Sequence, residues 1–424
     1  MINLEIPKKF RLLLNQAHQA AAEVFRPISR KYDLAEHTYP KELDMFAAMV
    51  DGISASGESN GAGAAGVRRK SSKAAPNSSK AEAEPASEDG DGEPAGTRSR
   101  NGANMSSVLS VMEMAWGDVG LLLSMPRQGL GNSAIASVAN DEQLERFKGV
   151  WASMAITEPG CGSDSANIRT TATLDGDHYV LNGEKIFVTA GERSDAVVVW
   201  ATLDKSLGRA AIKSFVVERG TPGMDVVRQE HKLGIRASDT ATIRFTDCRV
   251  PKENLLGSSE INTKNGFAGV MQTFDNTRPM VAAMAVGLAR AALEETHRIL
   301  TEAGVDINYD KPVHLLQAAA ATYIGLESDW EAAYLLTLRA AWMADNNQPN
   351  SLQASMAKAK AGRVCTEITL RCVELCGSAG YTEGRLLEKW ARDAKILDLF
   401  EGTQQIQQLI VARRLLGKTS AELK

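Results

Sequence analysis

The sequence predicts an α+β protein with an N-terminal helical domain, a central antiparallel β-domain and a C-terminal four-helix bundle. Three observations predict this fold class. Apolar residues near the N-terminus recur at helical spacing, short runs rich in Val, Ile and Thr fill the middle, and long Ala- and Leu-rich segments follow residue 267. A chain of 424 residues that is 44% hydrophobic can bury the cores of about two to four domains.

The N-terminal domain is expected over residues 1–154, with helical spacing at 10–25 and 108–123. An insertion at about 53–103 interrupts it. From 53 to 100 the insertion consists largely of Ala, Gly, Ser, Glu and Lys, with seven basic and seven acidic residues and no aromatic residue. Such a segment cannot bury enough apolar surface to fold, so we expect it to be disordered. Its match to the dinucleotide-binding pattern GxGxxG, at 61–66, has no flanking strand or helix and is attributed to composition.

The β-domain is expected over 155–255, where short runs are separated by Gly and Asp: TATLDG, HYVLNG, KIFVTA, AVVVWATL, KSFVVE, MDVVRQ and ATIRFTDCRV. The C-terminal domain is expected over 256–424. Its apolar spacing predicts helices at about 267–303, 312–345, 351–376 and 404–416, a set that suits a four-helix bundle.

Composition excludes several classes of function. With 48 Lys and Arg against 52 Asp and Glu, the net charge of −4 argues against binding to nucleic acid or to an anionic membrane. The five cysteines form no CxxC pair and the six histidines show no metal-ligand spacing, so no metal site is expected. The first residues lack the features of a targeting signal, and no apolar run is long enough to span a membrane. We therefore expect a reduced, cytoplasmic protein.

Two segments carry more specific information than periodicity. They are 155–164, AITEPGCGSD, and 392–407, RDAKILDLFEGTQQIQ. Here the chain resembles the acyl-CoA dehydrogenase family of flavoenzymes, and it is closest in pattern to the bacterial short- and medium-chain type. The resemblance continues in the same order through 182–185, 233–240, 250–254 and 274–279, and it covers nearly the whole chain outside the insertion.

The resemblance implies a reaction of fatty acid β-oxidation, the α,β-dehydrogenation of an acyl-CoA to a trans-2-enoyl-CoA. The reaction needs a base for the α-proton, polarisation of the thioester carbonyl and a hydride acceptor, which the family supplies as FAD. Glu401 corresponds to the base, and its backbone N–H would bind the thioester oxygen. Gly402, the next residue, corresponds to a substrate contact. The apolar residues before it favour a raised carboxyl pKa. The alternative is that Glu401 only caps the last helix. Electrons would pass to an electron-transfer flavoprotein.

Some members of the family carry the base immediately before a helix arginine, where this chain has Thr277. Threonine cannot take that role, which favours Glu401. In the same segment the resemblance places Phe274, Asp275 and Arg278 on the CoA part of the substrate. For Arg278 an ion pair with a helix acid is the alternative.

For the flavin, the resemblance assigns residues from two parts of the chain. Ile156, Thr157 and Ser163 correspond to contacts with the ring and pyrophosphate, Phe187 and Thr189 lie beside the ring, and Thr403 and Gln405 lie on the far side. Taken alone, a residue such as Phe187 is more often part of the core and Thr189 an ordinary strand residue, but their joint spacing favours the flavin role. Gly160 and Gly162 would let the backbone approach the cofactor, with Cys161 as a small filler.

Two positions depart from the family. Tetrameric members carry an arginine that reaches a neighbouring subunit's FAD, and the equivalent position here is Asp306; Glu374 stands where the family often has a glutamine. Two acids facing a diphosphate predict a heterotetramer with a paralogous subunit and about half an FAD per chain, rather than a homotetramer. The alternative is an alignment gap at Asp306.

Two other functions follow from the same motifs. One is a flavin-poor structural subunit, which Asp306 favours and Glu401 opposes. The other is an acyl-CoA oxidase, which needs a further C-terminal domain that 424 residues do not accommodate.

Overall fold

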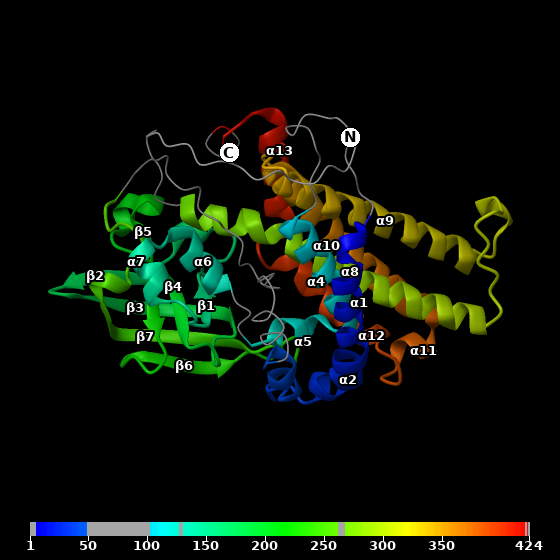
Figure 1. Cartoon of the computed structure of the whole chain (residues 1–424), viewed down its shortest axis with the longest axis horizontal. Coiled ribbons are helices and arrows are strands. Elements are labelled where there is room, and N and C mark those ends of the chain that lie inside the picture. Colours follow the sequence, from blue (N-terminus) through cyan, green and yellow to red (C-terminus); the bar gives the residue numbers. More distant parts are fainter. Residues whose placement is uncertain (1–5, 49–101, 127–129, 262–267, 420–421, 423–424) are drawn as a thin grey trace, which may run out of the picture.

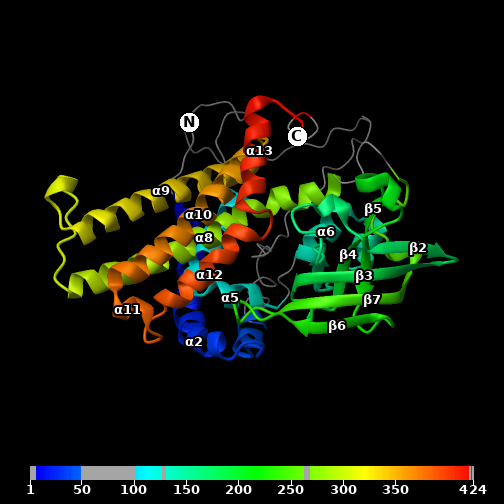
Figure 2. The ribbon, with the colours of Figure 1, turned by 180° about the vertical axis from the view of Figure 1, so that it is seen from behind.

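The computed structural model describes residues 6–48, 102–126, 130–261, 268–419 and 422. The insertion expected at 53–103 lies outside the described residues except for its last two, and so does the 61–66 segment. Strands gather at one end of the molecule and long helices at the other, as Figures 1 and 2 show from opposite sides. The α+β class predicted from the sequence is confirmed.

Helices form both terminal domains. The N-terminal part contains α1 (Arg11–Ala20), a π-helical turn (Ala21–Phe25), α2 (Arg26–Leu34), α4 (Ala103–Gly117), α5 (Val119–Ser124), α6 (Leu130–Val138) and α7 (Asp141–Arg146). The C-terminal part contains α8 (Ala268–Glu302), α9 (Ala318–Asp345), α10 (Ser351–Cys376), α11 (Ser378–Tyr381), α12 (Leu387–Leu399) and α13 (Gln404–Leu416). Helices α8, α9, α10 and α13 coincide with the four expected helices, and α12 is an additional helix that leads into the segment carrying Glu401.

The sheet comprises β1 (Ala152–Ala155), β2 (Thr171–Asp175), β3 (His178–Thr189), β4 (Ala196–Thr202), β5 (Ile212–Glu218), β6 (Met224–Gln229) and β7 (Thr240–Pro251). Its order is β1-β4-β2-β3-β7-β6, with β5 paired to β4. The sheet is mixed rather than purely antiparallel, because β1 pairs with β4 in parallel. The two runs HYVLNG and KIFVTA join into the single strand β3, which pairs with β7 through two register shifts.

Apolar cores lie on both sides of the sheet and within the bundle. Every residue of β4 is buried, as expected of a continuous apolar strand that is covered on both faces. The largest core joins α4 to the C-terminal helices, and an added Cβ at Gly287 of α8 would come within 2.2 Å of the Met112 carbonyl oxygen of α4. Glycine is therefore required where these helices cross.

The start of α4 is capped by a residue of another domain. The Asp345 carboxylate, at the end of α9, accepts hydrogen bonds from the backbone N–H groups of Gly102, Asn104 and Met105 at 2.7, 2.9 and 3.0 Å. These are the amides that a helix start leaves without a partner inside the helix. The first turn of α4 is thus fixed by the C-terminal domain.

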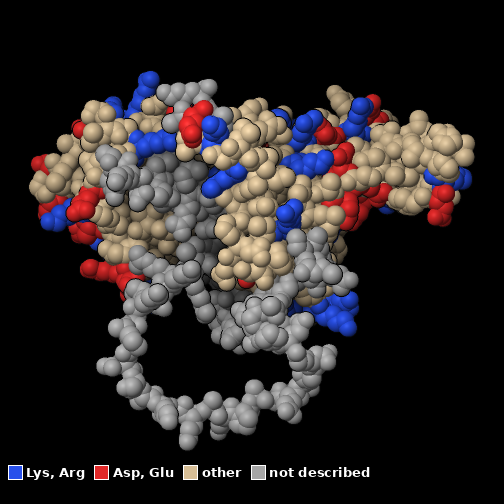
Figure 3. Space-filling view, turned by 90° about the horizontal axis from the view of Figure 1, so that it is seen from above, with Lys and Arg blue, Asp and Glu red and all other residues tan. Residues whose placement is uncertain are grey.

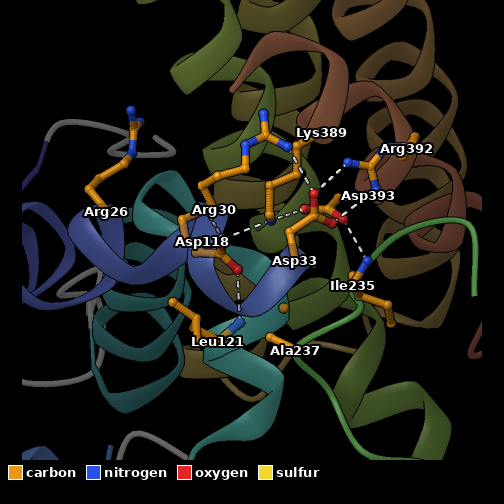
Figure 4. A network of polar contacts seen from close by, with 12 residues as sticks. Arg26, Arg30, Asp33, Asp118, Leu121, Ile235, Ala237, Lys389, Arg392 and Asp393 are labelled. Carbon is orange, nitrogen blue, oxygen red and sulfur yellow. Dashed lines mark hydrogen bonds and ion pairs between the residues drawn. The ribbon is translucent and has the colours of Figure 1, made fainter. Parts of the chain in front are cut away.

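A buried ionic network joins the three domains (Figure 4). Lys389 of α12 donates to Asp118, the N-cap of α5, at 2.7 Å and to Asp393, one turn along α12, at 2.5 Å. Asp118 also accepts from Ser29 of α2, and Asp393 accepts from the Ile235 N–H between β6 and β7. Burial alone would lower the pKa of Lys389, but the two carboxylates outweigh it and raise the pKa above its usual value.

The outer surface carries both signs of charge. On the face shown in Figure 3, Lys and Arg side chains lie among Asp and Glu side chains over the described part of the chain. Among the described residues, no helix combines the length and the apolar character that crossing a membrane would require.

Candidate active site

Glu401 lies in the four-residue connection between α12 and α13. Its backbone has φ = 54° and that of Gly402 has φ = 94°, so two successive residues of the connection have positive φ. Thr403 is the N-cap of α13, and its side chain accepts from the Ile406 N–H at 3.4 Å. Because Thr403 fills the capping position, helix capping does not account for Glu401.

Two buried side chains hold this connection by its carbonyl oxygens. Lys358 of α10 is 1% exposed, and its Nζ donates to the Gly402 carbonyl at 2.7 Å and to the Asp398 carbonyl at 3.2 Å. Gln407 of α13 donates from Nε2 to the carbonyls of Glu401 and Gly402 at 3.1 and 3.2 Å. Gly402 has a positive φ that side chains rarely adopt, and an added Cβ would also come within 2.4 Å of Gln407 Nε2, so glycine is favoured after the acid.

The Glu401 carboxyl has the environment of a proton acceptor. Its Oε2 is buried and has no hydrogen-bond partner among the described residues. Burial raises the carboxyl pKa above its usual value, while the Thr277 hydroxyl and the charges of Lys358 and Arg278 oppose this increase. Burial in turn lowers the pKa of Lys358 to about 8. A carboxylate oxygen without a partner in a poorly hydrated position can accept a proton from a bound molecule.

Thr277 and Arg278 approach Glu401 from α8. Both are buried, at 4% and 2% exposure, and the Thr277 hydroxyl donates to the Glu401 carboxylate. The residue just before the helix arginine is therefore a hydrogen-bond donor to Glu401. Arg278 acts electrostatically on Glu401, and its contact with CoA stays a prediction. The side chains of Phe274 and Asp275 lie outside the described ones.

In the β-domain, residues 156–163 form a loop fastened to β3. Lys185 is fully buried and donates to Glu158 at 2.8 Å and to the Ile156 carbonyl at 3.1 Å, while the Thr157 carbonyl accepts from Ile186 N–H at 2.9 Å. Burial alone would raise the pKa of Glu158, but Lys185 and several hydrogen bonds lower it. Lys185 therefore fixes the backbone at Ile156, and the Ile186 N–H fixes it at Thr157, two of the three predicted flavin residues of this loop.

The surroundings of this loop fit a bound flavin. An added Cβ at Gly160 or Gly162 would meet no protein atom within 4 Å, and neither glycine has a left-handed backbone, so neither packing nor conformation requires glycine there. Phe187 is 59% exposed on β3 with φ = 56°, at the irregularity between Lys185 and Val188. Open backbone at the two glycines and an exposed aromatic ring on a residue with strained backbone are features that binding of a planar cofactor would explain. Phe187 is thus not a core residue.

The remaining predicted flavin residues also lie toward solvent or are half-buried. Ser163 and Gln405 are exposed, whereas Thr189 and Thr403 are half-buried. Thr189 pairs with Thr240 of β7, and the segment just before β7 packs on α12, where an added Cβ at Gly234 would come within 2.5 Å of the Arg392 backbone. The 234–240 segment thus links the predicted flavin strand to the helix that leads to Glu401.

Sequence reasoning missed Lys358 and the Lys185–Glu158 pair. A lysine in an amphipathic helix normally lies at the surface, so the pattern of α10 gave no reason to place Lys358 inside. Lys185 and Glu158 lay within recognised motifs, at 182–185 and 155–164, but their pairing depends on the loop geometry.

Asp306 and Glu374 are both exposed, and each has a cationic neighbour. Asp306 pairs with Lys311 at 2.8 Å, and Glu374 pairs with Arg371 one turn before it on α10. These pairs reduce the negative charge that the two acids present to an approaching subunit.

Family models match two parts of the chain. One describes the acyl-CoA dehydrogenase middle domain and matches residues 153–248, and the other describes the acyl-CoA dehydrogenase C-terminal domain and matches residues 264–416. The first range contains the predicted flavin residues of the β-domain, from Ile156 to Thr189, and the second contains Glu401.

Named relatives and solved structures give the same result. The bovine mitochondrial short-chain specific acyl-CoA dehydrogenase is 41% identical over 262 residues, which is 62% of each chain. A subunit of the caffeyl-CoA reductase–Etf complex of Acetobacterium woodii, CarC, is 35% identical over 75% of this chain and 84% of that protein. The structure of butyryl-CoA dehydrogenase from Megasphaera elsdenii superimposes with a TM-score of 0.78 at 27% identity, covering 98% of this chain and 100% of the other.

Proposed function

Because the chain belongs to the acyl-CoA dehydrogenase family, we propose that it catalyses FAD-dependent dehydrogenation of an acyl-CoA to a trans-2-enoyl-CoA, with Glu401 as the base. The observation that carries the proposal is the Glu401 carboxyl, which has a buried oxygen without a partner and a raised pKa. Neither the cap of α13 nor the packing of the bundle uses this oxygen.

In the proposed reaction the Glu401 carboxylate takes the proton from the α-carbon while hydride leaves the β-carbon. Thr277 orients the carboxylate through its hydrogen bond, and the positive charges of Lys358 and Arg278 keep a fraction of the group ionised against the effect of burial. The Glu401 N–H, in a connection held by Lys358 and Gln407, would donate to the thioester oxygen as it gains negative charge.

Ile156, Thr157 and Ser163, with Phe187 and Thr189, would hold FAD on the β-domain, and Thr403 and Gln405 would contact it from α13. When bound, FAD supplies the hydride acceptor that no protein side chain can supply. The open backbone at Gly160 and Gly162 and the exposed Phe187 ring support this placement. The proposed CoA contacts remain Phe274, Asp275 and Arg278. Gly402 is the proposed contact beside the acyl group.

An electron-transfer flavoprotein is the proposed electron acceptor. CarC, similar to this chain over most of its length, belongs to a complex with Etf, which supports an acceptor of this kind. A tetramer is the proposed assembly.

The test compares wild type, Glu401→Gln and Glu383→Gln, the last an exposed acid in the turn before α12. Each protein is assayed with a panel of acyl-CoA chain lengths and an artificial electron acceptor. We expect Glu401→Gln to retain bound flavin and to lose turnover by several orders of magnitude, because an amide cannot accept the α-proton. Glu383→Gln should match wild type. Activity retained in Glu401→Gln would refute the assignment of the base.

A second candidate function is that of a flavin-poor subunit in a heteromeric dehydrogenase, which the exposed acids Asp306 and Glu374 favour. Flavin quantitation separates the two. About half an FAD per chain in a complex with a paralogous subunit, and little in the chain alone, would support this second function. One FAD per chain in the protein purified alone would eliminate it. Asp306→Arg with Glu374→Gln should raise the FAD content only if these acids face the cofactor.

A further inference from the structure

Glu36, His37 and His231 form a cluster of potential metal ligands near the end of α2. Glu36 and His37 lie in the turn after α2, and His231 lies between β6 and β7. The cluster therefore spans the boundary between the N-terminal domain and the β-domain. No residue of it belongs to the proposed flavin, CoA or acyl contacts.

The three side chains turn their potential ligand atoms toward one another. His231 Nδ1 lies 2.9 Å from Glu36 Oε2 and 3.3 Å from His37 Nε2, and the ligand atoms offered by the three residues all lie within 4.8 Å of one another. Ligands at zinc-bond lengths of about 2.0–2.2 Å in a tetrahedron are separated by about 3.4 Å. Only small side-chain movements would therefore bring the three atoms around one ion, and His231, 83% exposed, is free to make them.

The neighbours of the cluster prepare two of the ligands. The Gln229 side-chain oxygen lies 2.9 Å from His37 Nδ1, and because an amide oxygen cannot donate, Nδ1 must carry the proton. His37 Nε2 then has a free lone pair directed at His231. Gln229 is held in turn by its own hydrogen bond to Glu192. Orientation of a ligating histidine through its other nitrogen is a common feature of metal sites.

Glu36 is held in a similar way. Its Oε1 accepts from the Lys232 N–H at 2.9 Å, which leaves Oε2 for the cluster. The adjacent Lys232 ammonium is directed elsewhere, to the carbonyls of Glu230 and Ser238. The positive charge nearest in sequence therefore does not occupy the site.

We propose that Glu36, His37 and His231 bind a divalent transition-metal ion, with Zn²⁺ as the expected occupant, and that the ion fastens the N-terminal domain to the β-domain. Two imidazoles and one carboxylate are a ligand set that zinc accepts, with the fourth position left to water on the exposed side. The ion would contribute binding free energy only in the folded arrangement, so it would raise thermal stability. The histidines are 194 residues apart, so the absence of ligand spacing in the sequence does not exclude the site.

The test uses the full chain without a polyhistidine tag, stripped with chelator and titrated with ZnCl₂ at pH 7.5 by calorimetry and thermal denaturation, and with CoCl₂ by visible absorption. Wild type should bind one ion per chain, with an increase in Tm of about 2 °C or more. His37→Ala and His231→Ala should bind about tenfold more weakly or worse. His178→Ala is the matched control, because His178 is a partly exposed histidine that also pairs with a carboxylate, Asp177, but has no third potential ligand among the described residues.

Glu36→Gln guards against a folding defect in the histidine variants, because its amide oxygen can still accept from Lys232 while the ligand charge is lost. It too should weaken Zn²⁺ binding about tenfold or more. No saturable binding by wild type, or binding that all three ligand variants retain at wild-type affinity, would overturn the proposal. The titration reads the metal directly, so its result is independent of dehydrogenase activity.

Discussion

Lys358 places a buried positive charge beside a buried acid, and it also holds the connection on which that acid lies. Both effects come from one ammonium group, which donates to the Gly402 and Asp398 carbonyls and lowers the pKa of Glu401. Its own pKa is lowered to about 8 by burial, so it is mostly charged at neutral pH. We regard Lys358 as a positioning residue for the proposed base.

Lys358→Met should change the pH dependence of turnover. Without the ammonium, the ionised form of Glu401 loses a favourable interaction and its pKa rises, so the base becomes ionised only at higher pH. The ascending limb of the kcat/KM profile should therefore move to higher pH. Lys360→Met, two residues further along the same helix and paired with Asp329, should leave the profile in place. If the Lys358→Met protein is folded and the ascending limb of its kcat/KM profile lies at the wild-type pH, Lys358 does not act on the proposed base.

At the residue scale, the motif at 392–407 identified Glu401 as the candidate base, but nothing in the sequence indicated which groups surround its carboxyl. Taken alone, the sequence favoured a core position for Phe187, and only its exposure and positive φ in the structure exclude that position. His37 and His231 could not be paired in advance, because tertiary packing alone brings them together. The flavin and CoA contacts stay predictions.

At the scale of elements, periodicity predicted the long helices well because each one buries an apolar stripe. Helix α12 was not predicted, although Leu387, Trp390, Ala394 and Leu397 are all buried at helical spacing. The sequence from 392 onward was interpreted only as part of the motif at 392–407, and no helix was expected there before residue 404. The joining of two expected strands into β3 could not be predicted either, because a register shift lets the strand pass through Gly183.

Asp345→Asn should destabilise α4 without disturbing α9. The change removes the charge that favours a helix N-terminus and leaves fewer acceptors for three backbone N–H groups. We expect a loss of about 1–2 kcal/mol in the free energy of unfolding, measured with urea. Asp329→Asn, on the exposed surface of the same helix, should lie within about 0.5 kcal/mol of wild type. Equal stability of the two variants would show that Asp345 does not act as a cap.

At the scale of the whole molecule, the junction around Lys389 determines how the three domains are held together. Asp118 comes from the N-terminal domain, Asp393 from α12, and the Ile235 N–H from the β-domain (Figure 4). Because all these groups are buried, each depends on the others for compensation of its charge. Composition and periodicity define the domains, but they contain no information about this arrangement.

Lys389→Met should be strongly destabilising, since it leaves two buried carboxylates facing each other. We expect a loss of about 3–5 kcal/mol in the free energy of unfolding, measured by urea denaturation. The matched control is Lys395→Met in the same helix, where the lysine is 44% exposed and pairs with Asp398. It should lose no more than about 1 kcal/mol. Similar losses in both variants would show that the junction contributes little.

The way the α12–α13 connection is held has a consequence for divergence among related chains. Lys358 and Gln407 bind main-chain oxygens, which every amino acid possesses, so apart from Gly402 and the capping residue Thr403 the shape of the connection depends little on which side chains it carries. A substitution at Phe400 would change the side chain next to the proposed base while the path of the backbone persists. A change of substrate preference can therefore arise from side-chain substitutions within the connection. Loss of Lys358 or Gln407 would instead remove the hydrogen bonds that hold the backbone of the connection in place.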